Sequence, residues 1–188
     1  MKKLLIILLI AAAVGVLSMA GLVWYVVKEV QKPVEEDVRA LVVSADDLVP
    51  YFEGFEPNDI YETLYRFELF GLLIELNYEY ESEAAPYIST HVSEKGSVLG
   101  AKKDMLVQWK AFDISVGTNG ITLQENNEFY SVGDQSRFAD LILDEEVIGH
   151  ILMVRKEDFI YMFTMSGFIL PDEELWHELF DHRIEALK

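Results

Sequence analysis

One segment near the start of the chain is too apolar for the surface of a soluble fold. Residues 4–27 read LLIILLIAAAVGVLSMAGLVWYVV, and Ser18 is the only strongly polar side chain among them. A helix rises 1.5 Å per residue, so this segment would span about 36 Å, more than the roughly 30 Å of a bilayer's hydrocarbon core. The sequence therefore predicts a single N-terminal transmembrane helix.

The residues at the two ends of this segment predict its orientation. Lys2 and Lys3 precede it, whereas Trp24 and Tyr25 stand at its far end, as side chains at a membrane interface do. Positively charged flanks tend to stay on the cytoplasmic side. We therefore expect a single-pass protein of the cell membrane, with its N-terminus in the cytoplasm and its domain extracytoplasmic, either periplasmic or extracellular.

Small residues follow one side of the predicted helix. Ala11, Gly15 and Ser18 have i, i+4, i+7 spacing, which would let another membrane helix approach closely. The alternative is that Ala and Gly are simply common in membrane helices. Both interpretations stay open on the sequence.

A cleavable signal peptide is the main alternative to a retained anchor. The tripeptide at 18–20, Ser-Met-Ala, fits a small-x-small processing site after an apolar region. Cleavage there would leave the apolar residues 21–27 at the start of the mature chain, exposed to water. We therefore favour an uncleaved anchor at 1–27, a short polar tether at 28–36 and an extracytoplasmic domain at 37–188.

Charge is the strongest signal outside the membrane segment. All 33 acidic residues follow position 27, together with 13 of the 15 basic ones, which gives the remainder of the chain a net charge of −20. Nucleic acid and anionic lipid head groups are therefore poor partners for this domain. A basic protein surface or a cationic ligand fits, and so does a merely solvated acidic surface.

The stretch 130–168 forms the expected centre of the domain. It holds three apolar runs rich in Val, Ile, Phe and Tyr, separated by polar turns, which predicts a three-stranded antiparallel meander. In the last run, large side chains alternate with smaller or mixed ones. We expect this large face to lie in the core beneath the C-terminal helix; its members are Phe159, Tyr161, Phe163 and Met165.

A second strand pair is expected at 61–69 and 72–82. The second run alternates an apolar side, Ile74, Leu76, Tyr78 and Tyr80, with an acidic one. Side chains two residues apart on a strand lie about 7 Å from each other, within the roughly 8 Å Debye length at physiological salt. The sequence therefore predicts one negative, partner-binding face made by Glu75, Glu79 and Glu81.

The remaining segments complete an α+β prediction. Pro86 and the helical spacing of Met105, Leu106, Trp109 and Phe112 indicate helices between 84 and 115, split in two by Gly96 and Gly100. A short strand is expected at 120–123, a capping box at Ser44 and Asp47, and a final helix capped by Asp172. Together these elements predict an antiparallel sheet with helices packed on it.

The order of these elements resembles the PsbP-like α/β sandwich over about residues 40–187. The resemblance rests on a hairpin, a helical insert, an entry into the meander, an Arg-ended strand and a final helix. The motif residues are Gly133, Asp134, Ser136, Arg155, Ser166 and Gly167. That group includes extracytoplasmic lipoproteins and membrane-associated accessory proteins, so the resemblance implies an accessory or binding role, for which a bioenergetic complex is one setting. It supplies no catalytic residues.

A search for catalytic or metal-binding motifs is negative. The HELFDH segment places His177 and His182 five residues apart, about 140° round a helix, so they cannot share a ligand face as an H-E-x-x-H pair does. His150 is expected mid-strand with a hydrogen-bond partner at the edge of the core, and His91 in the helical insert. The chain has no cysteine, so thiol chemistry and disulfides are excluded.

The acidic turn near 140–146 is the other metal candidate. Asp140, Asp144, Glu145 and Glu146 lack EF-hand spacing, so a plain acidic turn is the favoured interpretation over a calcium site. We accordingly expect no cofactor, no metal and no enzyme activity. Two functions remain: a membrane-anchored accessory subunit that docks a membrane protein complex, and an extracytoplasmic domain that binds a small ligand between sheet and helices.

Overall fold

A computed structural model describes residues 34–69, 72–82 and 86–187 of the chain. Within these ranges no helix is long and apolar enough to cross a membrane. The expected anchor at 4–27 lies outside them, and so do its packing residues Ala11, Gly15 and Ser18 and its interface residues Trp24 and Tyr25.

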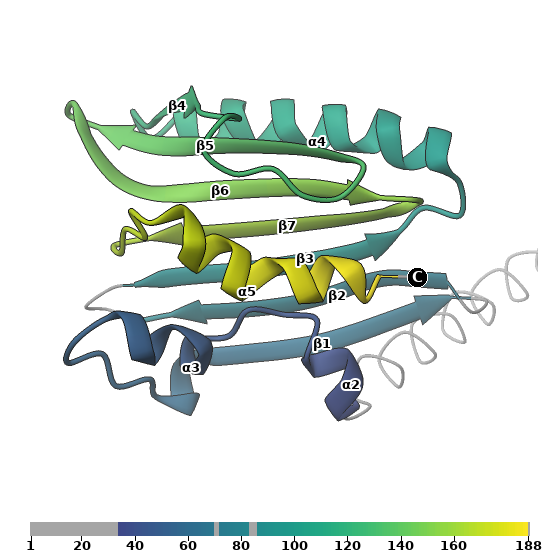
Figure 1. The fold of residues 1–188 in the computed structure, drawn as a ribbon, viewed down its shortest axis with the longest axis horizontal. Helices are drawn as coiled ribbons and strands as arrows, with labels where there is room; N and C mark the ends of the chain where they lie inside the picture. The colour runs from purple at the N-terminus through teal and green to yellow at the C-terminus, as the bar shows by residue number, and fades with distance from the viewer. Residues whose placement is uncertain (1–33, 70–71, 83–85, 188) are drawn as a thin grey trace, which may run out of the picture. The chain divides into compact units, whose positions relative to one another are not determined.

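The described residues form an α+β domain around one seven-stranded antiparallel sheet, as the sequence predicts (Figure 1). The strand order is β1-β2-β3-β7-β6-β5-β4. The strands are β1 (Glu62–Leu69), β2 (Leu72–Glu81), β3 (Tyr87–Glu94), β4 (Thr122–Glu125), β5 (Gln135–Leu143), β6 (Glu146–Lys156) and β7 (Phe159–Ser166). Among the strands of the described residues, only the β3–β7 pair joins strands that are not neighbours along the chain.

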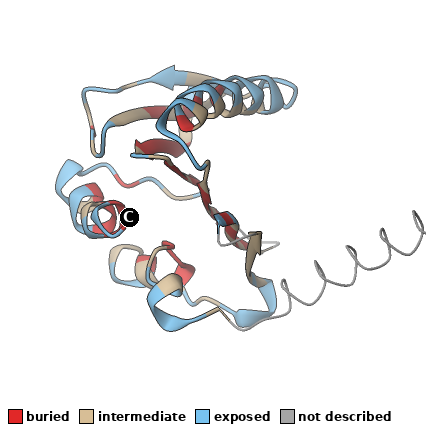
Figure 2. Ribbon diagram, turned by 90° about the vertical axis from the view of Figure 1, so that its right-hand side faces the viewer, coloured by how far each residue is buried: buried red, intermediate tan, exposed pale blue. Residues whose placement is uncertain are grey.

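Helices cover the two faces of the sheet unequally (Figure 2). One face carries α5 (Glu173–Glu185) together with the N-terminal segment that holds α2 (Glu36–Arg39), α3 (Ala45–Leu48), and the 3-10 turns η1 (Val49–Tyr51) and η2 (Asp59–Tyr61). The other face carries α4 (Val98–Gly117), which packs on β4, β6 and β7. The sheet therefore separates two apolar cores, a large one under α5 and a small one under α4.

The expected meander is confirmed as β5, β6 and β7. Its large face points into the core under α5, where Phe163 lies 4.9 Å from the ring of Phe180 and 6.0 Å from that of Trp176. Tyr161 also contacts Phe180, at 6.1 Å between ring centroids. The periodicity of this strand therefore predicted both its face and the helix that covers it.

The region 84–115 was interpreted wrongly as two helices. Its first part is β3, a central strand between β2 and β7 whose Ile88, Thr90 and Val92 are fully buried. Its second part is the single helix α4, capped by the Ser97 hydroxyl, which accepts a hydrogen bond from the Gly100 amide. Glycine suits position 100 in the first turn, because an added Cβ would lie 2.9 Å from the Ser97 hydroxyl oxygen.

The hairpin of β1 and β2 is confirmed, but one residue of its apolar face differs from the alternation predicted for 72–82. The register moves from Phe67↔Glu75 to Glu68↔Leu73, so Ile74 is the extra residue of a β-bulge. Leu73 takes the buried position and Ile74 is exposed. The bulge leaves the acidic side of the strand unchanged from residue 75 onward.

The N-terminal segment is fixed to the C-terminal helix by a buried arginine. Asp47 closes the predicted capping box by accepting from the Ser44 amide at 2.8 Å. Arg183 of α5, which is 7% exposed, donates to the Val42 carbonyl at 3.0 Å and to Asp47 at 2.8 Å. These bonds hold α3 and α5 together on one face of the sheet.

Candidate functional sites

The first candidate is a half of the sheet that α4 leaves uncovered. We call it the open half-face: the α4 side of β1, β2 and β3. It is bordered by α4 on one flank (Figure 2). Among the described residues of these strands, alternation places the following side chains on it: Thr63, Tyr65, Phe67, Leu69, Leu72, Glu75, Asn77, Glu79, Glu81, Tyr87, Ser89, His91 and Ser93. None of these is Lys or Arg.

The three glutamates predicted from the sequence do share this face. We call Glu75, Glu79 and Glu81 the acidic patch; Glu81 is exposed and the other two are half-buried. Asn77 stands between Glu75 and Glu79, so their backbone spacing is about 14 Å, twice that between Glu79 and Glu81. The patch is therefore one row of carboxylates rather than a tight cluster.

Neighbouring side chains hold Glu75 in place. The Tyr65 hydroxyl donates to its Oε1 at 2.8 Å, and the Nδ1 atom of His91 lies 3.7 Å from the same oxygen. Burial and this carboxylate raise the pKa of Tyr65 to about 12, so the hydroxyl keeps its proton. Burial lowers the pKa of His91 and outweighs the raising effect of Glu75, so His91 does not neutralise the patch at neutral pH.

A shallow hollow of about 370 Å³ runs along the boundary between the open half-face and α4. It is lined by Asn77, Ser89, His91 and Met162 from the sheet and by Gln108, Ala111, Phe112 and Ser115 from α4. His91 therefore lies on β3 at the floor of a groove, and its assignment to a helical insert was wrong.

Sequence reasoning missed a second feature of α4, its apolar outer side. Leu106 was expected in the buried stripe but is exposed, and Leu99, Val107 and Ile114 are 63%, 64% and 70% exposed. Helical spacing puts these four on one side, roughly opposite the buried Met105 and Trp109. The signal was the weak separation of apolar from polar residues along this helix, and a patch of exposed aliphatic groups marks a contact surface.

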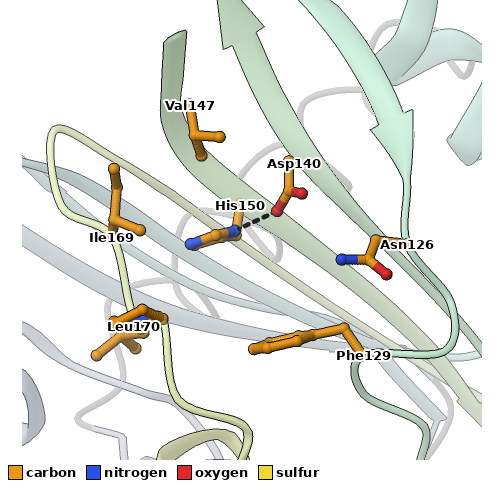
Figure 3. Close-up of a pocket in the computed structure, with 8 residues that line it drawn as sticks. Asn126, Phe129, Asp140, Val147, His150, Ile169 and Leu170 are labelled. Atoms are coloured by element: carbon orange, nitrogen blue, oxygen red, sulfur yellow. Dashed lines mark hydrogen bonds and ion pairs between the residues drawn. The ribbon is translucent and has the colours of Figure 1, made fainter.

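The second candidate is a small cavity on the α5 side of the sheet (Figure 3). Its volume is about 180 Å³. Its lining comes from the loop after β4, from β5 and β6, and from the segment before α5: Asn126, Phe129, Asp140, Val147, His150, Ile169, Leu170 and Pro171. Most of this lining is apolar.

His150 is the central polar group of this cavity. Its Nδ1 atom lies 2.9 Å from Asp140 Oδ1, which confirms the expected hydrogen-bond partner. Burial lowers the pKa of His150 although the bond to Asp140 opposes that shift, so the ring is neutral at pH 7. Its Nε2 atom is buried and finds no hydrogen-bond partner among the described residues.

The other motif residues serve structure. Asp134 Oδ2 accepts from Arg155 at 2.9 Å and from the Glu157 amide at 2.7 Å, joining the start of β5 to the β6–β7 turn. Gly133 has φ +72° and touches Val154 and the Arg155 carbonyl so closely that no Cβ fits. These residues carried the resemblance drawn from the sequence, and here they close a turn.

No metal site is found in the described parts of the chain, where no group of three or more His, Cys, Asp or Glu could hold an ion. His177 bonds Asp181 at 2.9 Å on the exposed side of α5 rather than approaching His182. Asp144 and Glu145 form the β5–β6 turn with positive φ, while Asp140 is engaged by His150. The plain acidic turn is therefore the better interpretation of 140–146.

No family model, curated protein or solved structure matches this chain. The resemblance to the PsbP-like group accordingly stays a prediction.

Proposed function

We propose that this chain is a membrane-anchored, non-catalytic accessory subunit or interaction domain of a membrane protein complex. In this proposal the extracytoplasmic domain docks a basic surface of a partner protein through the open half-face. The observation that carries the proposal is a sheet face beside α4 that bears the acidic patch and no Lys or Arg among its described residues. The anchor at 4–27 is the other half of the proposal.

The side chains of the open half-face suit a protein contact. Tyr65, Phe67 and Tyr87 are half-buried on it, and tyrosine and phenylalanine are enriched at protein interfaces. The Tyr65 hydroxyl is already bonded to Glu75, so this part of the surface is ordered before a partner arrives. A preordered surface loses less conformational entropy on binding.

The charge of the patch favours a basic partner and sets its salt dependence. Glu79 and Glu81 are within one Debye length of each other, so a basic surface would meet their combined field. Opposite charges across a protein interface chiefly raise the association rate and select the partner. A membrane anchor would keep both proteins in one bilayer, which raises their effective concentration and lets a modest contact suffice.

The outer side of α4 supports contact with a second surface of the same partner. Its four exposed aliphatic residues would lose contact with water in a complex, and each fully buried one would contribute roughly 1.5 to 3 kcal/mol. Lys103 and Lys110 fall on the same side by helical spacing. The partner would therefore be basic opposite the patch, and opposite α4 it would be apolar with acidic or hydrogen-bond-accepting groups for the two lysines.

Co-purification of the full-length protein from mild detergent tests this function. We expect a stoichiometric membrane complex whose association weakens as salt rises, because exposed charges are screened. Reversing the acidic patch to Lys should weaken the complex more than an equal charge change elsewhere. The matched control reverses Glu53, Glu128 and Glu185, which are exposed and lie outside the open half-face.

Two results would count against the proposal. If the patch reversal and the control reversal leave the same amount of complex at low salt, the docking surface lies elsewhere. If the unmodified protein leaves the membrane as a monomer, the accessory-subunit role itself fails, whatever the patch does.

A further inference from the structure

The cavity beside His150 has the features of a built binding site. It is bounded by three separate segments: the loop after β4, the β5–β6 pair and the approach to α5 (Figure 3). His150 is 4% exposed, and its ring packs against Phe138 at 5.5 Å and Trp176 at 5.4 Å, which also contact each other at 4.9 Å. This aromatic packing and the hydrogen bond to Asp140 fix the direction in which its nitrogen atoms point.

Asp140 decides which nitrogen of His150 carries the hydrogen. A carboxylate only accepts, so the Nδ1 atom must donate across the 2.9 Å contact. In a neutral imidazole the other nitrogen, Nε2, then presents a lone pair. Figure 3 shows Nε2 on the side of the ring away from Asp140, toward Ile169 and Leu170.

The unpartnered Nε2 defines the chemistry of an occupant. Buried polar atoms in folded proteins nearly always have a hydrogen-bond partner, and this acceptor has none among the described residues. An occupant must therefore donate an O–H or N–H to it. The surrounding Phe129, Val147 and Leu170 require the remainder of the occupant to be apolar.

We propose that this cavity binds a small apolar molecule with a single hydrogen-bond donor, such as a phenol or a compact alcohol, which donates to His150 Nε2. The volume of about 180 Å³ restricts the occupant to about one ring. Carboxylates are disfavoured because Asp140 is close and the domain is strongly acidic. Asp140 is a positioning residue, since it touches His150 rather than the occupant.

This site is independent of the docking function. Asp140 and His150 face the α5 side of the sheet, whereas the acidic patch faces the α4 side. Either proposal can therefore fail without the other.

Phenol and toluene are the matched probes, because they have similar size and differ in the donor. The full-length protein, with ¹⁵N-labelled histidine, is placed in nanodiscs, and empty nanodiscs correct for partition into lipid. We expect phenol to shift the Nε2 resonance of His150 saturably, with the other three histidines unmoved. We expect toluene to bind at least tenfold more weakly.

Two variants separate a binding site from a merely structural histidine. His150→Phe keeps a ring but removes the acceptor, so the preference for phenol over toluene should vanish. Ile169→Trp fills the cavity from a wall residue that is 43% exposed. That variant should fold and lose both probes, which keeps the test valid if the first variant does not fold.

Three results would overturn the proposal. The first is equal affinity for phenol and toluene in the unmodified protein. The second is unchanged phenol binding in Ile169→Trp. The third is an Nε2 resonance that shows a hydrogen bond before any probe is added and does not move on titration, as a resident water would give.

Discussion

Replacing Arg183 with Met should destabilise the domain by about 2 to 4 kcal/mol. The guanidinium donates to two backbone carbonyls, those of Val42 and Leu179, and to the Asp47 carboxylate. Hydrogen bonds to a charged group contribute roughly 1.5 to 3 kcal/mol each, and breaking one partner of a buried pair costs about 3 to 5 kcal/mol. The side chain of Asp47 is 32% exposed and keeps its bonds to Ser44, which places the loss below that upper range.

Thermal unfolding, followed by near-ultraviolet circular dichroism, measures this change. For a domain of about 150 residues each kcal/mol shifts Tm by about 2 to 4 °C, so we expect a fall of about 4 to 16 °C. The melting temperature of Arg183→Lys should lie between those of the unmodified protein and Arg183→Met, because lysine keeps the charge beside Asp47 but loses the planar guanidinium group. A melting temperature within about 2 °C of the unmodified protein for Arg183→Met would refute the reasoning. It would mean that apolar packing replaces the network without loss.

Three further predictions follow from the same structure. Phe163→Ala should cost about 3 to 5 kcal/mol, since the ring is fully buried against α5, and a Tm change no larger than that of Glu53→Ala would show that the face is misassigned. The pKa of His150 should lie below 6.5 by NMR titration. Because burial depresses this pKa, the contribution of the neutral His150 ring to stability is complete above pH 6.5 and falls as the pH drops from 6.5 through the pKa of the folded protein. His150→Gln should remove this loss of stability. N-terminal sequencing of the membrane-extracted protein should give an uncleaved segment; a mature chain that starts at Gly21 would end the anchor hypothesis.

Local patterns predicted much of the fold. The hairpin at 62–81, the meander and the final helix each show a clear period of two or 3.6 residues, and each forms where it was expected. The capping box at Ser44 and the cap at Asp172 needed only local spacing. Elements with one buried side and one polar side are the ones that a sequence reveals most directly.

The missed strand shows where this reasoning fails. In β3 the partly polar run Tyr87–Glu94 lies between β2 and β7, and Ser93 is buried alongside Val92. Its pairing with β7 joins residues 65 to 79 positions apart, so no local pattern shows it. Pro86 drew the interpretation toward a helix, although it stands just before the first residue of a strand, where proline is also accepted.

The pairing of His150 with Asp140 shows why a candidate site can be hidden even in a correctly predicted hairpin. The two-residue turn at Asp144 and Glu145 pairs Leu143 with Glu146, and continuing that register would place Asp140 opposite Gly149. The observed register instead shifts at Ile148, where a β-bulge adds one residue to β6 and brings His150 opposite Asp140.

The same bulge explains the glycine beside it. A Cβ on Gly149 would lie 2.0 Å from the Met165 carbonyl, so β6 and β7 can approach this closely only because residue 149 has no side chain. The shift keeps the neighbouring strands paired while it turns His150 toward Trp176 and the cavity. Periodicity alone could not predict the pairing of His150 with Asp140, because this pairing arises where a β-bulge interrupts the period of two. Such bulges are over-represented next to functional sites.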